Sequence, residues 1–287
     1  MYKYILYYLK NFFILIRINK PTGMWLLMFP TFWALIMASE GKVDIQLLVL
    51  FAFGSFIMRS AGCIINDIID KKIDSNIVRT KNRPLASGSL NNADALILLI
   101  IFLSIGLSIL LSLNTNCIIL GIAVFPLIII YPFMKRLIYF PQLILAITFN
   151  FGTLIAWTAV AGYIDKKSLI LYFSCVFWTL AYDTIYALQD KIDDEKFGIK
   201  SLAIYLGKNN KYWIIFFYLC FISGIFYLGI TINLNFIFFF LIILFTLKII
   251  FEVIKLDLYQ PKNCTRNFQL NSWYGFFITI SLYLNYI

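Results

Sequence analysis

The chain has 287 residues, of which 62% are hydrophobic and only 13% are charged, and it carries a formal net charge of +10. About a quarter of the residues of a soluble protein are charged, so this composition excludes an ordinary soluble protein and indicates a membrane protein. There is no histidine, and the five cysteines lack CxxC spacing. Haem ligation by histidine, histidine-bound di-iron centres and Cys/His zinc sites are therefore excluded.

The first 20 residues predict a basic lead-in at the membrane interface. They contain Lys3, Lys10, Arg17 and Lys20 but no small-residue cleavage site of the kind that a signal peptide needs. Apolar stretches follow, each about 20 residues long, which is the length that crosses the hydrocarbon layer as a helix. The nine predicted spans are residues 21–39, 44–66, 91–111, 116–134, 139–162, 168–189, 211–231, 234–254 and 268–287.

These runs are continuously apolar, whereas the strands of a membrane barrel alternate. We therefore expect an all-α membrane protein with a single domain over residues 1–287. Cytoplasmic loops carry an excess of Lys and Arg. With the N-terminus in the cytoplasm, all 24 basic residues except Lys42, Lys166 and Lys167 fall on the inner side. Nine spans then place the C-terminus outside, and membrane lipid accounts for the positive charge, so nucleic acid is not needed as a partner.

Acidic residues gather where the span 44–66 ends. The sequence from Asn66 to Asp74 reads NDIIDKKID. If the helix continues, Asn66, Asp70 and Asp74 recur every four residues on one face, with Asp67 beside them. Like charges at that spacing repel each other unless a cation lies between them. The pattern therefore predicts a metal site.

A second acidic cluster follows the span 168–189, in the sequence YDTIYALQDKIDDEKFGIKS. Asp183, Asp190 and Asp194 are seven and four residues apart, which would place them on one face of a continuing helix. Asp193 and Glu195 add further charge. Two carboxylate clusters suit Mg²⁺, which takes oxygen ligands together with substrate phosphates. The predicted metal ligands are Asn66, Asp67, Asp70, Asp74, Asp190, Asp193 and Asp194.

Basic residues near the clusters are candidates for anion binding. Arg59 lies two helical turns before Asn66, at a depth where a charged side chain is costly. Tyr131, Lys135 and Arg136 form a further polar group that could contact phosphate or carboxylate. For Arg59 and Arg136 a purely structural role is an equal alternative.

These motifs resemble the UbiA family of intramembrane prenyltransferases. The family pattern NDxxDxxxD is matched at residues 66–74, DxxxD at Asp190 and Asp194, and YxxxK at Tyr131 and Lys135. The likeness covers nearly the whole length, and further similar segments are RINKPTG at 17–23, PTFWAL at 30–35, RTKNRPLASG at 79–88, PQLILA at 141–146 and NSWYGF at 271–276. One departure is Ile192, where close relatives commonly have an acidic residue.

The resemblance implies a bundle of nine transmembrane helices around a central cavity, with the aspartate motifs at its cytoplasmic mouth and a side opening for an isoprenoid tail. It implies Mg²⁺-dependent transfer of a polyprenyl group from an allylic polyprenyl diphosphate to 4-hydroxybenzoate, at the ring carbon ortho to the hydroxyl, in ubiquinone biosynthesis. We expect such an enzyme in the bacterial inner membrane, with its active site on the cytoplasmic side.

The resemblance also assigns roles to individual residues. Asp70, Asp74, Asp190 and Asp194 would act in catalysis by supporting loss of the diphosphate, and Asp190 is a candidate for orienting or deprotonating the phenol. The candidate substrate-binding residues are Asn66, Tyr131 and Lys135 near the diphosphate, Arg136 for the acceptor carboxylate, and Arg17 and Arg59 for either anion.

Two alternatives remain open. A prenyltransferase of the same family could use another acceptor, as in menaquinone, homogentisate or haem chemistry. An ion-coupled transporter is less favoured, because its charges are expected in the middle of spans, whereas the acidic residues here lie at span ends.

Overall fold

The structure is a computed structural model that describes residues 2–286. Within this range every regular element is a helix. The helices are α1 Tyr2–Leu15, α2 Thr22–Ala38, α3 Ile45–Asp74, α4 Asn92–Leu111, α5 Thr115–Leu137, α6 Pro141–Phe149, α7 Phe151–Ala161, α8 Lys166–Ala187, α9 Lys191–Lys196, α10 Leu202–Leu206, the 3-10 helix Gly207–Asn209, α11 Asn210–Thr231, α12 Phe236–Ile254 and α13 Pro261–Tyr283.

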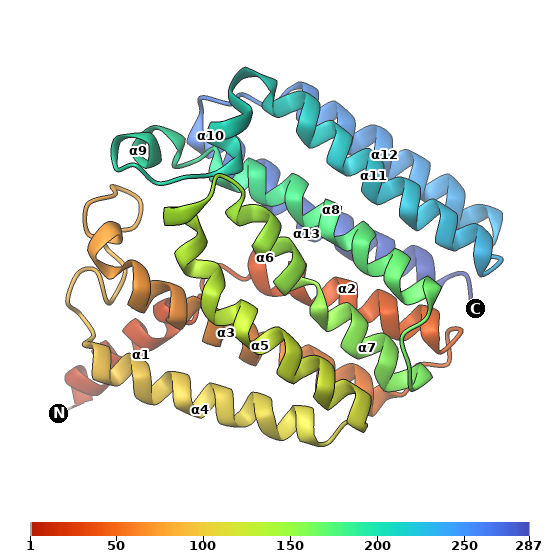
Figure 1. Cartoon of the computed structure of the whole chain (residues 1–287), viewed down its shortest axis with the longest axis horizontal. Coiled ribbons are helices and arrows are strands. Elements are labelled where there is room, and N and C mark those ends of the chain that lie inside the picture. The colour runs from red at the N-terminus through yellow and green to blue at the C-terminus, as the bar shows by residue number, and fades with distance from the viewer. Residues whose placement is uncertain (1, 287) are drawn as a thin grey trace.

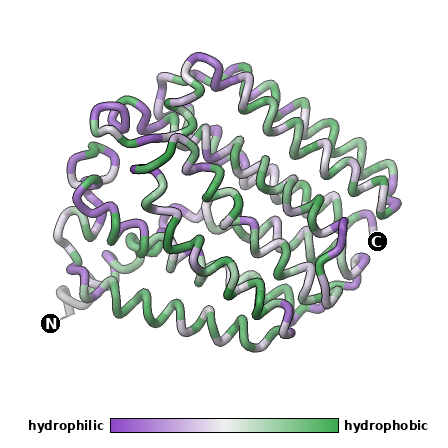
Figure 2. The backbone as a smooth tube through the Cα atoms, in the orientation of Figure 1, coloured by the Kyte–Doolittle hydropathy of each residue, from purple (hydrophilic) through white to green (hydrophobic). Residues whose placement is uncertain are grey.

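The long helices lie side by side along a common direction (Figure 1). The segment after α3, together with α9 and α10, lies at the same end as the N-terminus, and the C-terminus lies at the opposite end (Figure 1). Hydrophilic residues gather at the two ends, whereas the middle parts of the helices are hydrophobic (Figure 2). This is the distribution expected of helices that cross a lipid layer, and the chain is an integral membrane protein.

The all-helical prediction is confirmed for the described residues, and each of the nine predicted spans coincides with helical structure. Seven segments are long and apolar enough to cross a membrane by length and composition. The helix α2 is apolar but has only 17 residues, and α13 begins with the polar stretch PKNCTRN. The count of nine spans therefore stays a prediction.

The predicted span 139–162 is two helices, α6 and α7, which meet at Asn150. A break inside the membrane leaves backbone groups that need new partners. The Asn150 amide nitrogen donates to the carbonyl of Ala146 at 2.8 Å, the carbonyl of Cys175 at 3.2 Å and the hydroxyl of Thr179 at 2.8 Å. The break is thus stabilised by contacts with α8.

The two acidic clusters differ in local structure. The helix α3 continues without a break from Ile45 to Asp74, so the predicted face of Asn66, Asp70 and Asp74 is confirmed. The expectation of one continuing helix through the second cluster is wrong, because α8 ends at Ala187 and a turn precedes α9. Because of this turn, Asp183 and Asp190 do not share one helical face. Asp190 faces the segment after α3.

A buried polar contact joins α8, α11 and α13 in the core. The side-chain oxygen of Asn271 accepts hydrogen bonds from the Trp178 indole at 3.0 Å and from the Tyr218 hydroxyl at 2.9 Å. Trp178 also stacks on Phe221 with ring centroids 5.4 Å apart. Removing the shared acceptor would leave two buried donors without partners, which is costly in an apolar interior.

We therefore expect the substitution Asn271→Leu to lower the free energy of unfolding by about 1–3 kcal/mol, measured as a fall in thermal stability of the purified protein in detergent. The matched control is Ser272→Ala on the same helix, since the buried Ser272 hydroxyl has no hydrogen-bond partner and its removal should cost little. Equal stability losses in the two variants would contradict the importance of the Asn271 contact.

Candidate active site

A large cavity of about 1390 Å³ joins a charged mouth to an apolar interior. The mouth is formed by the C-terminal end of α3, the segment after it, the end of α5 and the region from α8 to α9. The interior is lined by apolar residues of α3, α4 and α5, among them Phe51, Leu103, Leu107, Ile122 and Phe125. One cavity can thus contain both a charged group and a long hydrocarbon group.

Three carboxylates of α3 are almost completely buried at the mouth. Asp67 is 2% exposed, and Asp70 and Asp74 are each 4% exposed. A buried carboxylate is strongly destabilising unless an opposite charge accompanies it. Each of the three has such a partner, and the partners come from other segments of the chain.

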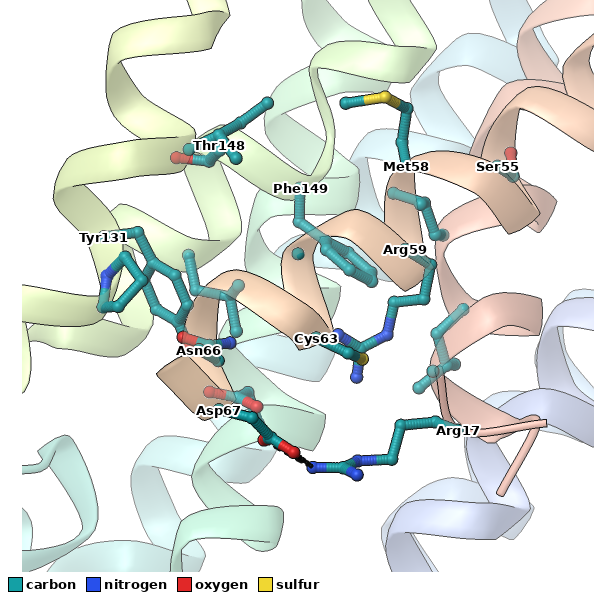
Figure 3. Close-up of a pocket in the computed structure, with 18 of the residues that line it drawn as sticks. Arg17, Ser55, Met58, Arg59, Cys63, Asn66, Asp67, Tyr131, Thr148 and Phe149 are labelled. Carbon is teal, nitrogen blue, oxygen red and sulfur yellow. Dashed lines mark hydrogen bonds and ion pairs between the residues drawn. The ribbon is translucent and has the colours of Figure 1, made fainter. Parts of the chain in front are cut away.

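Asp67 is held by two arginines. Arg17 donates to its two carboxylate oxygens at 2.6 and 2.9 Å (Figure 3), and Arg83 approaches it at 3.1 Å. Arg83 also bonds to Asp74 at 2.6 Å, so one guanidinium links two acidic residues of the motif. Arg17 has a backbone φ of 62°, the left-handed conformation that non-glycine residues rarely adopt. That conformation follows the end of α1 and places Arg17 at the mouth.

Asp70 is paired with the end of α5. The Lys135 ammonium forms an ion pair with its carboxylate, while Arg136 lies 3.5 Å away and donates to the carbonyl of Ile69 at 2.8 Å. Lys135 lines the cavity, and Arg136 is not among its lining residues. The structure thus brings Lys135 to the site as expected and places Arg136 on its outer edge.

Asp190 is held by Arg79, a residue 111 positions earlier in the sequence. The two nitrogen–oxygen contacts measure 2.7 and 2.5 Å, and Arg79 also donates to the Tyr186 hydroxyl at 3.1 Å. This is the two-pronged geometry that makes arginine a strong carboxylate partner. The pair connects the segment after α3 with the turn between α8 and α9, so the two acidic clusters face one mouth.

The other acidic residues of the second cluster differ in position. Asp194 lines the cavity, and its pKa is raised to about 7 by burial and by the neighbouring charge of Asp190. Asp193 is not a lining residue and lies 3.9 Å from the exposed Lys196. Asp194 is therefore brought to the site, and Asp193 is not.

The donor set of the mouth fits a hard divalent cation. Within residues 2–286, no three Asp, Glu or Cys side chains already converge on one point, because cations from the chain separate the carboxylates. The available ligands are all oxygen atoms, which Mg²⁺ prefers. They include Asp194, whose carboxylate forms no ion pair with any described residue. A metal ion could take the places that the arginines and the lysine hold.

Arg59 lies deeper in the cavity than the motif residues. Its guanidinium is 5.9 Å from the ring centre of Phe149 (Figure 3). A Cβ atom at Gly23 would lie 2.6 Å from the Arg59 Nε atom, so the glycine makes room for the guanidinium. Tyr131 lies near Asn66 in the same view (Figure 3), and both line the cavity.

Sequence reasoning did not single out Arg79 and Arg83 as site residues. They belong to a region with five basic residues, Lys71, Lys72, Arg79, Lys81 and Arg83, and the positive-inside rule explains such residues without a site. Only the folded segment distinguishes the two arginines that turn to the carboxylates. Asp183, which also lines the cavity, was noted only as part of a helical face.

Comparison with known proteins gives consistent matches. The profile of the UbiA prenyltransferase family matches residues 27–279. The chain is 40% identical over 273 residues to "4-hydroxybenzoate polyprenyltransferase, mitochondrial" of Aedes aegypti. This alignment covers 94% of this chain but only 62% of that enzyme. It is 40% identical over 268 residues to the 4-hydroxybenzoate octaprenyltransferase of Legionella pneumophila, covering 91% of this chain and 93% of the relative.

A plant relative is the 4-hydroxybenzoate geranyltransferase 1 of Lithospermum erythrorhizon, which is 37% identical over 271 residues, with 94% of this chain and 88% of that enzyme covered. Among solved structures, a UbiA homolog from Aeropyrum pernix matches with a TM-score of 0.77 and 21% identity, over 92% of this chain and 98% of that one.

A UbiA homolog from Archaeoglobus fulgidus bound to GPP and Mg²⁺ matches with a TM-score of 0.72 and 16% identity, over 96% of this chain and 99% of that one. At these identities the two structural matches show a shared fold. The family profile covers most of the chain, and the Legionella enzyme aligns along most of its own length. The chain therefore belongs to the UbiA prenyltransferase family.

Proposed function

We propose that this chain transfers a polyprenyl group from an allylic polyprenyl diphosphate to the ring carbon of 4-hydroxybenzoate ortho to its hydroxyl, in ubiquinone biosynthesis. The observation that carries the proposal is the one cavity that joins an acidic and basic mouth to an apolar interior. A polyprenyl diphosphate has the same two-part character. The names of the relatives from mosquito, Legionella and Lithospermum support the acceptor.

The apolar interior would hold the prenyl tail and keep water from the reacting carbon. Loss of diphosphate leaves an allyl cation, which water would capture. The lining residues Leu103, Leu107, Ile122 and Phe125 offer no nucleophile to that cation. Relatives at similar identity are named for octaprenyl and geranyl donors, so we propose no particular tail length.

Mg²⁺ is the proposed cofactor, and Asn66, Asp70, Asp74, Asp190 and Asp194 would hold it. It would neutralise the diphosphate and stabilise the charge that develops on the leaving group. Asp67 is the least available of the predicted ligands, since Arg17 and Arg83 both hold it, and Asp193 lies outside the cavity lining. The Archaeoglobus homolog has GPP and Mg²⁺ bound in one structure, which supports a site that holds a diphosphate together with Mg²⁺.

The chain's own cations would bind the diphosphate oxygens. Lys135, Arg79 and Arg83 are held at the mouth by ion pairs with carboxylates. If Mg²⁺ bound those carboxylates, the three cations would be released next to the phosphates of the substrate. Tyr131, which lines the same region, would add a hydrogen-bond donor.

Arg59 is the better placed cation for the acceptor carboxylate. It lines the cavity beside Phe149, whereas Arg136 is at the outer edge and is 44% exposed. A guanidinium matches a carboxylate with two parallel hydrogen bonds. We therefore move the proposed carboxylate-binding role from Arg136 to Arg59.

We also propose that the chain is one catalytic domain in a bacterial inner membrane, with the N-terminus and the mouth on the cytoplasmic side. The support is the family match over residues 27–279, the near-complete alignment with the Legionella enzyme, and the concentration of Lys and Arg on one side.

The metal proposal predicts that Asp70→Asn and Asp190→Asn each lower turnover at saturating Mg²⁺ by about 100-fold or more, because each removes a negative ligand from the site. The measurement is prenylated product formed in purified membranes. Asp193→Asn is the matched control and should retain most activity. Undiminished turnover in both the Asp70 and the Asp190 variants would refute the metal site.

The exchange of partners at the mouth predicts opposite effects of Arg83→Gln on two ligands. Mg²⁺ alone should bind more tightly, by about threefold or more, because a competing positive charge is gone, while a non-hydrolysable diphosphate analogue should bind more weakly. Calorimetry on purified protein measures both affinities. Lys196→Gln, which removes an exposed cation outside the cavity, should change neither. A loss of Mg²⁺ affinity in the Arg83 variant would contradict the exchange.

The proposed acceptor predicts that purified membranes use 4-hydroxybenzoate with a kcat/KM at least about tenfold above those for 1,4-dihydroxy-2-naphthoate and homogentisate, since a site built for one set of polar groups discriminates against others. A product assay with one prenyl donor and the three acceptors in parallel makes the comparison. Preference for another acceptor would overturn the assignment and leave the family and fold unchanged.

A further inference from the structure

Asp183 is a carboxylate of the cavity wall that the proposed mechanism does not use. It lies on α8, one helical turn before the end of that helix, and lines the cavity. Asp67, Asp70, Asp74 and Asp190 are each paired with a cation of the chain. Among residues 2–286, no hydrogen bond or ion pair holds the Asp183 side chain.

Arg59 of α3 is a cation that lines the same cavity as Asp183. The two side chains nevertheless form no ion pair, and Arg59 has no carboxylate partner in the described part of the chain. The Arg59 guanidinium instead lies against the ring of Phe149, and Gly23 leaves room for it because it has no side chain. The interior of the cavity therefore contains one positive and one negative group from different helices that stay apart.

Two charged groups held apart in an apolar cavity are unfavourable unless a bound ligand pairs with each of them. The ligand that would do so has an anionic group at one end and a hydrogen-bond donor at the other. A 4-hydroxybenzoate ion has a carboxylate and a phenol hydroxyl on opposite ends of its ring. Asp190 is the candidate for the phenol that the sequence suggested, but Asp70 and Asp190 are proposed metal ligands, so Asp183 is the wall carboxylate left for that role.

We propose that Asp183 binds the phenol end of the acceptor, its carboxylate accepting the hydrogen bond of the phenol O–H while Arg59 binds the acceptor carboxylate. This inference rests on the proposed function, since it takes the acceptor to be a 4-hydroxy acid. Asp183 then has two effects. It orients the ring, and its charge shifts electron density toward the phenol oxygen and hence toward the ortho carbon. That carbon forms the new C–C bond with the prenyl cation, whose C–O bond to diphosphate has broken, and the ring then loses its ortho proton to the released diphosphate.

The same geometry makes Asp183 a specificity residue. An aromatic acid without the hydroxyl would leave the Asp183 carboxylate in the cavity wall without a partner, and sites of this kind discriminate strongly against such analogues. Wild-type protein should therefore bind 4-hydroxybenzoate more tightly than benzoate. The difference between the two ligands measures the contact of the phenol alone, because both have the carboxylate that Arg59 would bind.

The experiment compares binding of 4-hydroxybenzoate and benzoate to wild type, Asp183→Asn and the control Asp257→Asn, each with Mg²⁺ and a diphosphate analogue present. Asp257 is exposed and does not line the cavity. In Asp183→Asn the preference for 4-hydroxybenzoate should fall by about tenfold, with benzoate affinity unchanged or higher, since a negative charge near the anion is lost. In turnover, kcat should fall and KM for the acceptor should rise.

Thermal stability of each purified variant in detergent, compared with wild type, shows that it is folded. An unchanged ligand preference in a folded Asp183→Asn protein would overturn the proposal, and so would a loss of Mg²⁺ or diphosphate affinity, which would make Asp183 part of the metal site. Failure of the wild type to use 4-hydroxybenzoate at all would instead refute the proposed function on which the inference rests.

Discussion

The buried carboxylates of α3 are the constraint on which the site depends. Asp67, Asp70 and Asp74 lie almost free of solvent at the end of a membrane helix, where unpaired charges are very unfavourable. Their partners come from three different parts of the chain: the end of α1, the segment after α3, and the end of α5. The need to balance these charges therefore determines how the segments around the mouth are arranged.

The same pairing makes the mouth suitable for a charged substrate. Arg83 and Lys135 stabilise the buried carboxylates by pairing with them, and they would be positioned for phosphate if a metal ion took those carboxylates. Little rearrangement of the backbone is then needed, because the side chains that exchange partners already lie within hydrogen-bond distance of each other. Preorganisation of this kind lowers the cost of binding a highly charged ligand.

Much of the site could be predicted from the sequence, because α3 is one uninterrupted helix and its periodicity gives the face of Asn66, Asp70 and Asp74. The second cluster was predicted less well, since spacing alone does not reveal that α8 stops at Ala187. Long-range ion pairs such as Arg79 with Asp190 could not be predicted from the sequence. Many basic residues are expected on that side of the membrane, and only the folded structure shows which of them contact a carboxylate.

The break at Asn150 has a consequence for how the protein is assembled. A lone membrane helix satisfies its own backbone, whereas the segment from α6 to α7 depends on an amide that donates to Cys175 and Thr179 of the next span. Before α8 is in place, the Asn150 side-chain amide lacks two of its three acceptors. The bend between α6 and α7 is therefore completed only when α8 packs against it.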